Sequence, residues 1–282
     1  MKKIFILTSY LQKKNLEGYV FKGGTCLAKA YLDHFRFSED LDFTFIDQKL
    51  WEGKSTKNIK KICEERINTF GEQLEKISFG FKFDKKNINY VMLGSNNKLV
   101  TFKVHYISVL TGNPSFIKIQ INFLEKIMFV PKTKELIPLI KINQFTKEDQ
   151  IYFKEFLDFY KPIKIKVYDI REIVAEKVRS LLTRKTIKSR DAIDLLFIYN
   201  TFKIRPQDLL KETKEKLLFS IITYDKYKSN LILTKEKLQT LEFQYNEVYP
   251  LAIRSFNKED FENYVKKLKP LLIEMAEEIK LK

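Results

Sequence analysis

Two segments near the start of the chain are the most informative: Phe21-Lys22-Gly23-Gly24-Thr25 and Arg36-Phe37-Ser38-Glu39-Asp40-Leu41-Asp42-Phe43. The residues before the glycines, 19–21, are apolar or aromatic and predict a short strand. Because glycine has no Cβ, the backbone after this strand can turn tightly and come close to a ligand. The apolar spacing of residues 25–35 predicts a helix after the turn. A turn that leads into a helix can hold a phosphate with its main-chain N–H groups.

The second segment has the two-residue period of a half-buried strand. Leu41, Phe43 and Phe45 alternate with polar residues, so Asp40 and Asp42 point to one face. Cα atoms two apart on a strand are separated by roughly 6.5 to 7 Å, and flexible carboxylates can converge on one Mg²⁺ or bridge two ions ~3.5 to 4 Å apart. Each segment by itself is also typical of a hairpin turn or of solvent-exposed acids. Together they predict a magnesium-dependent nucleotide site, because Mg²⁺ commonly couples one or two carboxylates to substrate phosphates.

The rest of the chain has two differently patterned parts. A polar helix is expected at residues 56–74, and strands are expected at 89–93, 99–110 and 116–123. From about residue 147 the pattern is mainly helical, apart from an extended run at 163–168. We therefore expect an α+β fold, with a mixed sheet and flanking helices in a domain at 1–135. A mostly helical domain at 136–282 is expected to complete the site.

A lysine in an apolar helix face is the second informative feature. The helix expected at 169–182 begins with Asp169 as a plausible N-cap and carries Lys177 in the middle of its apolar stripe. The opposite side carries charged residues, Glu172, Glu176 and Arg179. Lys177 could extend its ammonium to water at the edge of the stripe. Otherwise it needs a carboxylate or an anionic ligand, because burying an unpaired charge is costly.

Asp191 and Asp194 are the candidate partners of Lys177, because they lie three apart near the start of the next apolar helix. Carboxylates are also favoured at that place by the helix dipole. The pair is therefore equally typical of helix capping with a salt bridge to Arg184 or Arg190.

The composition of the chain bears on its partners and location. The formal net charge of +16 predicts attraction to polyanions, since contacts to phosphates release counterions. The excess charge is mostly lysine, and this bias could also reflect an AT-rich genome. Two cysteines are too few for a disulfide framework, no apolar run is long enough to span a membrane, and the apolar segment at 4–7 is too short for a secretory signal. These features predict a cytoplasmic protein without a membrane partner.

Taken together, the chain resembles the AbiEii/AbiGii nucleotidyltransferase toxins, which belong to the DNA polymerase β-like nucleotidyltransferases. The matching motifs are Gly23-Gly24-Thr25-x-Leu27, Arg36-x-Ser38-Glu39-Asp40-Leu41-Asp42-Phe43, Glu172-Ile173-x-Ala175-Glu176-Lys177, Arg184 and Arg190-Asp191-x-x-Asp194-Leu195. The resemblance implies a nucleotidyltransferase-like sheet and a toxin of a toxin–antitoxin or abortive-infection system, with a cognate antitoxin. It also implies Mg²⁺-dependent transfer of a nucleotide from an NTP to an RNA acceptor, in some relatives the 3′ end of tRNA.

The resemblance further assigns roles to individual residues. The implied nucleotide-binding residues are Gly23, Gly24, Ser38 and Lys177. The implied Mg²⁺ ligands, which are also catalytic, are Asp40 and Asp42. Lys177 is implied to act in catalysis, and Asp191 is implied to complete the active site.

One departure from the family pattern concerns a third acid. Many nucleotidyltransferases carry it on a later strand, but the expected strand here has Gln120 and Asn122 at the candidate positions. Glu125 or Asp191 could take its place, or the site could work with one firmly held ion.

Two other functions fit parts of the sequence. Residues 40–44 also fit the Asp-x-Asp-x-Thr signature of haloacid-dehalogenase-like phosphohydrolases, but that chemistry needs an apolar strand leading into the first aspartate, and residues 36–39 are too polar. A non-catalytic nucleic-acid-binding protein would explain the positive charge but not the position of Lys177. His34 and His105, the only histidines, are too few for a histidine-rich metal site or a histidine-based triad.

Overall fold

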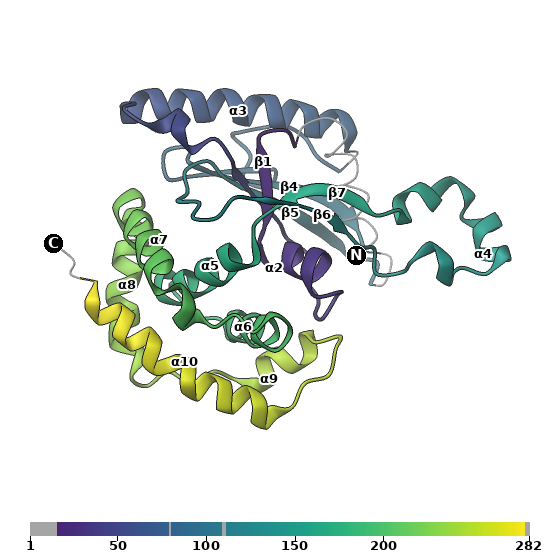
Figure 1. Cartoon of the computed structure of the whole chain (residues 1–282). Helices are drawn as coiled ribbons and strands as arrows, with labels where there is room; N and C mark the ends of the chain where they lie inside the picture. The colour runs from purple at the N-terminus through teal and green to yellow at the C-terminus, as the bar shows by residue number, and fades with distance from the viewer. Residues whose placement is uncertain (1–15, 79, 109–110, 280–282) are drawn as a thin grey trace. The chain divides into compact units, whose positions relative to one another are not determined.

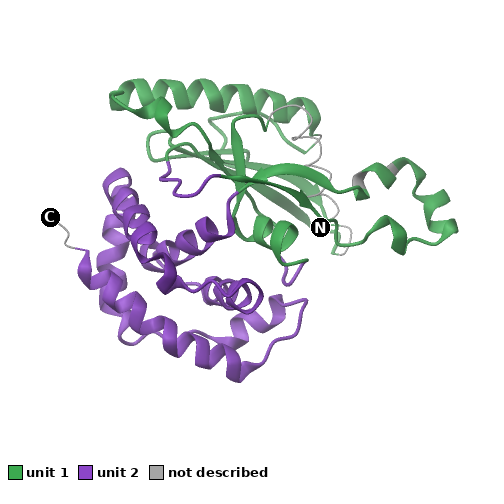
Figure 2. Cartoon of the chain, viewed as in Figure 1, with its two compact units in different colours: residues 1–33, 38–124, 131–167 green, residues 34–37, 125–130, 168–282 purple. Residues whose placement is uncertain are grey.

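The computed structural model describes residues 16–78, 80–108 and 111–279 (Figure 1). The short apolar segment at 4–7 lies outside these residues. The chain forms two compact units (Figure 2). Unit 1 contains residues 1–33, 38–124 and 131–167, and unit 2 contains residues 34–37, 125–130 and 168–282. The expected division into domains at residues 135 and 136 stays a prediction.

In the described part of unit 1, seven strands form one mixed sheet in the order β3-β4-β5-β2-β1-β7-β6. The strands are β1 (Tyr19–Lys22), β2 (Leu41–Phe45), β3 (Val91–Gly94), β4 (Leu99–Ile107), β5 (Pro114–Asn122), β6 (Lys132–Leu136) and β7 (Ile163–Val167). β2 pairs parallel with β5, and β1 pairs parallel with β7, while the other neighbours are antiparallel. The predicted mixed sheet is confirmed.

One face of this sheet is apolar and is covered by α3. Figure 1 shows α3 (Thr56–Ile77) lying across the sheet. The ring of Phe70 on α3 lies 5.8 Å from Tyr19 on β1 and 5.2 Å from Phe102 on β4, measured between centroids. The alternation along each strand therefore turns the apolar residues toward α3, and the polar residues, including Asp42, lie on the other face.

The remaining helices of unit 1 are shorter. They are α2 (Gly23–Cys26), which continues as the π-helix η1 (Leu27–Tyr31), η2 (Gln48–Trp51), η3 (Ile142–Gln144), α4 (Lys147–Tyr152) and η4 (Lys154–Tyr160). The helix expected at 25–35 therefore starts two residues earlier and ends four residues earlier than its apolar spacing indicates.

β6 is a strand that the sequence did not predict. Four of its five residues are exposed, and only Leu136 is buried. In the described part of the chain it pairs only with β7, at the edge of the sheet. A polar edge strand lacks the apolar alternation by which a strand is recognised.

Unit 2 is built from helices. They are α5 (Ile170–Thr183), α6 (Ser189–Phe202), η5 (Pro206–Leu209), α7 (Leu210–Thr223), α8 (Asp225–Leu238), α9 (Tyr245–Val248), η6 (Tyr249–Leu251) and α10 (Lys258–Glu278). The side chain of Asp169 caps α5 by accepting a hydrogen bond from the Arg171 N–H, as expected.

α5 forms the centre of unit 2 and packs against α6, α7, α8 and α10. Because helices surround α5, its charged side is buried as well as its apolar stripe. Glu172 and Arg179 are only 0% and 6% exposed. In the described residues, no helix combines the length and apolar character needed to cross a membrane.

Candidate active site

The glycine turn and the second aspartate of the acidic strand are in direct contact within unit 1. Gly23 has φ +78°, in the left-handed region that favours glycine. A Cβ at Gly23 would clash with the carboxylate of Asp42. The missing side chain therefore leaves the space into which the Asp42 carboxylate extends.

Thr25 ties the segment before β2 to the same turn. Its hydroxyl donates to the carbonyl oxygen of Asp40, 2.6 Å away, and lies 2.9 Å from the hydroxyl of Ser38. Thr25 is 1% exposed. Sequence reasoning assigned Ser38 to the site but gave Thr25 no role, although its position directly after the two glycines was a usable signal.

The two acids lie where the alternation predicted. Asp40 precedes β2 and Asp42 lies on it, and both are half-buried; Asp42 stands between the buried Leu41 and Phe43. Asp42 is opposite Lys22 on β1 and opposite Gln120 on β5. Gln120 donates from Nε2 to the Thr101 hydroxyl at 3.2 Å. The position beside Asp42 on the neighbouring strand therefore holds an amide.

In unit 2, the prediction that Lys177 meets carboxylates is confirmed. Lys177 is 7% exposed. Its Nζ lies 2.8 Å from Oδ1 of Asp191 and 2.6 Å from Oδ2 of Asp194. Arg184 also pairs with Asp191, so both carboxylate oxygens of that residue are engaged. The expected salt bridge to Arg184 and the expected partnership with Lys177 are thus both present.

Arg36 completes this cluster and is a residue to which sequence reasoning gave no role. Its guanidinium binds Asp194 with two hydrogen bonds, Nε to Oδ1 at 2.5 Å and Nη2 to Oδ2 at 2.7 Å. Burial opposes ionisation of Asp194, but Arg36 and Lys177 outweigh it and lower the pKa of Asp194 to about 2. Among the described residues the cluster contains three cations and two carboxylates, which leaves one positive charge in excess.

The sequence matches a protein-family model, described as the nucleotidyl transferase AbiEii toxin of type IV toxin–antitoxin systems, over residues 6–275. The chain belongs to the AbiEii family. It is therefore a member of a nucleotidyltransferase toxin family, in agreement with the resemblance carried by its motifs.

Two crystal structures from Helicobacter pylori are similar to this AbiEii chain. JHP933 has 16% identity and a TM-score of 0.40, covering 98% of this chain and 92% of its own. A protein solved as a candidate nucleotidyltransferase has 17% identity and a TM-score of 0.41, covering 100% of both chains. No curated protein matches the sequence.

Glu172, which belongs to the AbiEii-like motif, holds another part of unit 2 in place. Its Oε2 accepts hydrogen bonds from the backbone N–H groups of Met128 and Phe129, at 2.7 and 2.8 Å. Its Oε1 lies 2.6 Å from Nζ of Lys216, which is also 3.3 Å from Oε1 of Glu125. Glu125, one of the candidate substitutes for the third acid, is thus engaged by a buried lysine. The sequence gave no signal for this pairing.

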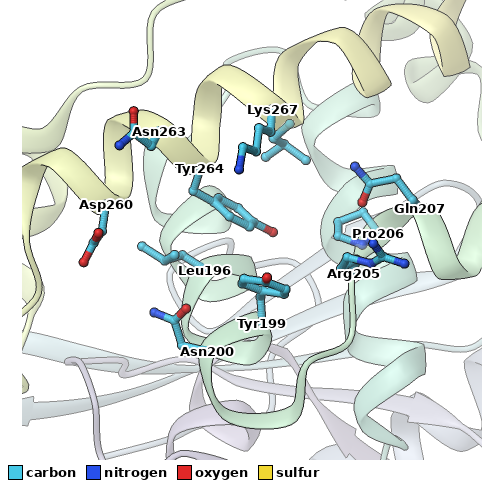
Figure 3. A pocket seen from close by; sticks show the side chains of 11 residues that line it. Leu196, Tyr199, Asn200, Arg205, Pro206, Gln207, Asp260, Asn263, Tyr264 and Lys267 are labelled. Atoms are coloured by element: carbon cyan, nitrogen blue, oxygen red, sulfur yellow. The ribbon is translucent and has the colours of Figure 1, made fainter.

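Unit 2 of this AbiEii chain also contains a cavity of about 600 Å³ between α6, the segment before α7, and α10. Figure 3 shows the rings of Tyr199 and Tyr264 side by side within it, and their centroids are 6.2 Å apart. Arg205 and Lys267 also line the cavity. None of the residues predicted for the active site lines it.

Proposed function

We propose that the chain is a Mg²⁺-dependent enzyme that transfers a nucleoside monophosphate from an NTP to an RNA acceptor, the 3′ end of tRNA. One observation carries the proposal. Asp42 extends its carboxylate into the space over Gly23, and Asp40 is tied to the same turn through Thr25. A turn suited to phosphate and two acids suited to Mg²⁺ therefore meet at one place.

The residues at this place fit a magnesium ion. Asp40 and Asp42 would hold it, since Mg²⁺ takes oxygen ligands and often uses one or two carboxylates together with substrate phosphates. Among the described residues no group of three or more His, Cys, Asp or Glu side chains is placed to hold a metal. This favours one firmly held ion, with Gln120 beside Asp42 where a third acid was expected. When bound, the ion would neutralise phosphate charge during the transfer.

Three further residues of unit 1 would bind and position the nucleotide. Gly23 and Gly24 would offer their main-chain N–H groups to the triphosphate, because they begin the helical segment that follows β1. Ser38 would lie beside the phosphates, held by its contact with Thr25.

In unit 2, Lys177 would contact the nucleotide. Its cluster has one positive charge in excess, which favours an anionic ligand. Asp191 is 0% exposed and has both oxygens engaged by cations. We therefore propose that Asp191 acts as a positioning residue that orients Lys177.

The phosphohydrolase alternative is disfavoured by the place of Asp40. Its chemistry requires the first aspartate at the carboxyl end of a strand, whereas β2 begins at Leu41, after Asp40. A non-catalytic nucleic-acid-binding protein does not need the contact between Gly23 and Asp42.

The type IV toxin–antitoxin family supports a cognate antitoxin as the protein partner. We place the reaction in the cytoplasm, where NTPs and tRNA are available.

The proposal is tested by incubating the chain with Mg²⁺, each α-labelled NTP and total tRNA. Wild type should label tRNA, and Asp42→Asn should reduce labelling by at least ~100-fold, because several kcal/mol of charge stabilisation are lost. The matched control is Asp47→Asn, the same change at an exposed acid two residues beyond β2. EDTA should abolish labelling by the wild type.

Equal labelling by wild type and Asp42→Asn would refute this site. RNA binding without labelling by any NTP would favour the non-catalytic alternative.

A further inference from the structure

We infer that the sheet face carrying Asp42 continues into a binding surface for the single-stranded 3′ end of the RNA acceptor. The surface consists of Lys103 on β4 together with Phe116 and Lys118 on β5, and we call it the β4–β5 patch. The inference rests on the proposed function, because it assigns a path to the acceptor of that reaction.

Strand register places the β4–β5 patch on the same face as Asp42. Asp42 is opposite Gln120, and Gln120 is opposite Thr101 on β4. Side chains two apart on a strand share a face, so Lys118 lies on the Gln120 face, and Lys103 lies on the Thr101 face. The patch therefore begins one two-residue step, roughly 6.5 to 7 Å along the strands, from the row that contains Asp42.

The patch concentrates positive charge. Lys103 and Lys118 are directly opposite each other in the antiparallel pairing of β4 and β5, and like charges in that position are destabilising. In the described part of the chain, the partners of these two lysines are a carbonyl oxygen and an aromatic ring and not a carboxylate. The Lys103 ammonium donates to the carbonyl oxygen of Ile88 at 3.0 Å. An anionic ligand would thus remove a repulsion that the protein itself leaves in place.

Both ammonium groups lie over an exposed aromatic ring. Phe116 is 39% exposed. The Nζ atoms of Lys103 and Lys118 lie 5.5 and 5.9 Å from its centroid. Proteins that bind single-stranded nucleic acids combine cations, which follow the phosphates, with aromatic rings on which bases stack. A base can stack on Phe116 only if it is not stacked in a duplex, so a single-stranded end is the form that fits.

The occupant of the β4–β5 patch is therefore the stretch of RNA that precedes the reacting hydroxyl. Phe116 would stack one base, and the two lysines would each contact a phosphate. Lys118, on β5, is two residues from Gln120. The RNA would therefore run from the patch toward the row of side chains that contains Asp42.

Binding is tested with a fluorescently labelled single-stranded RNA and no NTP. The double variant Lys103→Gln, Lys118→Gln should weaken binding at least ~10-fold, and it should lower the slope of log affinity against log salt by about 1.4, which corresponds to two phosphate contacts. The matched control is Lys57→Gln, Lys61→Gln, which removes two exposed lysines from α3, the helix on the other face of the sheet. The control should change affinity less than about twofold.

Phe116→Leu keeps an apolar side chain but removes the aromatic face. It should weaken binding roughly 5-fold or more without changing the salt slope. During catalysis, variants of the patch should raise KM for RNA and leave KM for the NTP unchanged.

Three results would overturn the inference. The first is that the double variant weakens binding no more than the control does. The second is that the same RNA binds equally tightly as a duplex. The third is that polyglutamate binds equally tightly and through the patch, which would indicate an acidic protein as the occupant. The binding assay requires no transfer, so its outcome is distinct from the labelling test of Asp42. If the wild type labels no RNA with any NTP, the proposed function fails whether or not RNA binds the patch.

Discussion

Lys177 on α5 and Asp194 on α6 form a buried ion pair, with Nζ 2.6 Å from Oδ2, and Asp194 is completely enclosed. Arg36 binds the same carboxylate from the other end of the sequence of unit 2, 158 residues away. One carboxylate therefore holds two cations in place, and its removal would leave both without their shared partner. This arrangement explains how a lysine can lie within the apolar stripe of a helix.

Asp194→Asn should strongly destabilise the protein. The substitution leaves Arg36 and Lys177 with less compensation in a buried site, and breaking buried pairs in this way typically costs ~3 to 5 kcal/mol. Urea unfolding followed by circular dichroism measures the loss. Asp208→Asn is the matched control in unit 2, because its ion pair with Arg205 is exposed to solvent. The free energy of unfolding should fall much less in the control, since water and salt screen exposed ion pairs. Equal losses would contradict the structural role of Asp194.

Gly23→Ala should abolish labelling of tRNA. Its Cβ would occupy the space of the Asp42 carboxylate and displace a proposed Mg²⁺ ligand. Gly53→Ala is the control, because Gly53 also has a positive φ, +68°, but its Cβ would meet nothing within 4 Å. Both variants carry the backbone cost of an alanine in the left-handed region, of the order of 1 kcal/mol. Labelling at a temperature where both variants are folded separates the two effects. Full activity of Gly23→Ala would show that Asp42 is not needed in this position.

Because of Lys29, the stability of the protein should vary with pH in the alkaline range. Burial lowers the pKa of Lys29 to about 8 from its usual 10.5. Between these values the unfolded chain binds the proton more strongly than the folded protein, so stability rises with pH across this window. The wild type should gain up to about 3 kcal/mol relative to Lys29→Met between pH 8 and 10.5.

Unfolding of both proteins across this pH range measures the difference. Burial also raises the pKa of Cys63 to about 12, which acts in the opposite direction but cancels in the comparison. Lys57→Met, at an exposed position on α3, should track the wild type at every pH. A constant difference between wild type and Lys29→Met would contradict the prediction.

Tyr264→Phe should leave stability unchanged or increase it by about 1 kcal/mol. The Tyr264 hydroxyl is buried and, within the described residues, has no hydrogen-bond partner, so its removal relieves a desolvation cost. Tyr227→Phe removes the same atom from a tyrosine that interacts with the buried Arg179, whose Cζ lies 5.3 Å from the centroid of the tyrosine ring, and it should destabilise the protein. The urea midpoint should therefore fall for Tyr227→Phe and stay the same or rise for Tyr264→Phe. A loss at Tyr264 as large as that at Tyr227 would indicate a partner for its hydroxyl.

The local elements of the fold follow from local sequence. The alternation of Leu41, Phe43 and Phe45 predicted β2 and the face of Asp42, and the helical spacing around Lys177 predicted α5 and the inward lysine. These predictions succeeded because the spacing of apolar residues indicates which side of a strand or helix is buried. Burial of apolar surface is the main favourable contribution to folding. β6 was missed because it is a polar strand at the sheet edge. It buries only Leu136, so its sequence has no alternation of apolar and polar residues.

The sequence by itself determined the local parts that neighbouring residues make: the glycine turn, the alternating acids and the apolar helix face that carries Lys177. Only the tertiary structure decided which distant groups meet, such as Arg36 with Asp194, Glu172 with Lys216, and Gln120 beside Asp42. The reason is physical. A turn or a strand depends on the backbone preferences and polarity of a few adjacent residues, whereas a partner for a buried charge is selected by packing across the whole unit. Many carboxylates in the sequence could pair with Arg36, and packing brings the enclosed Asp194 into contact with it.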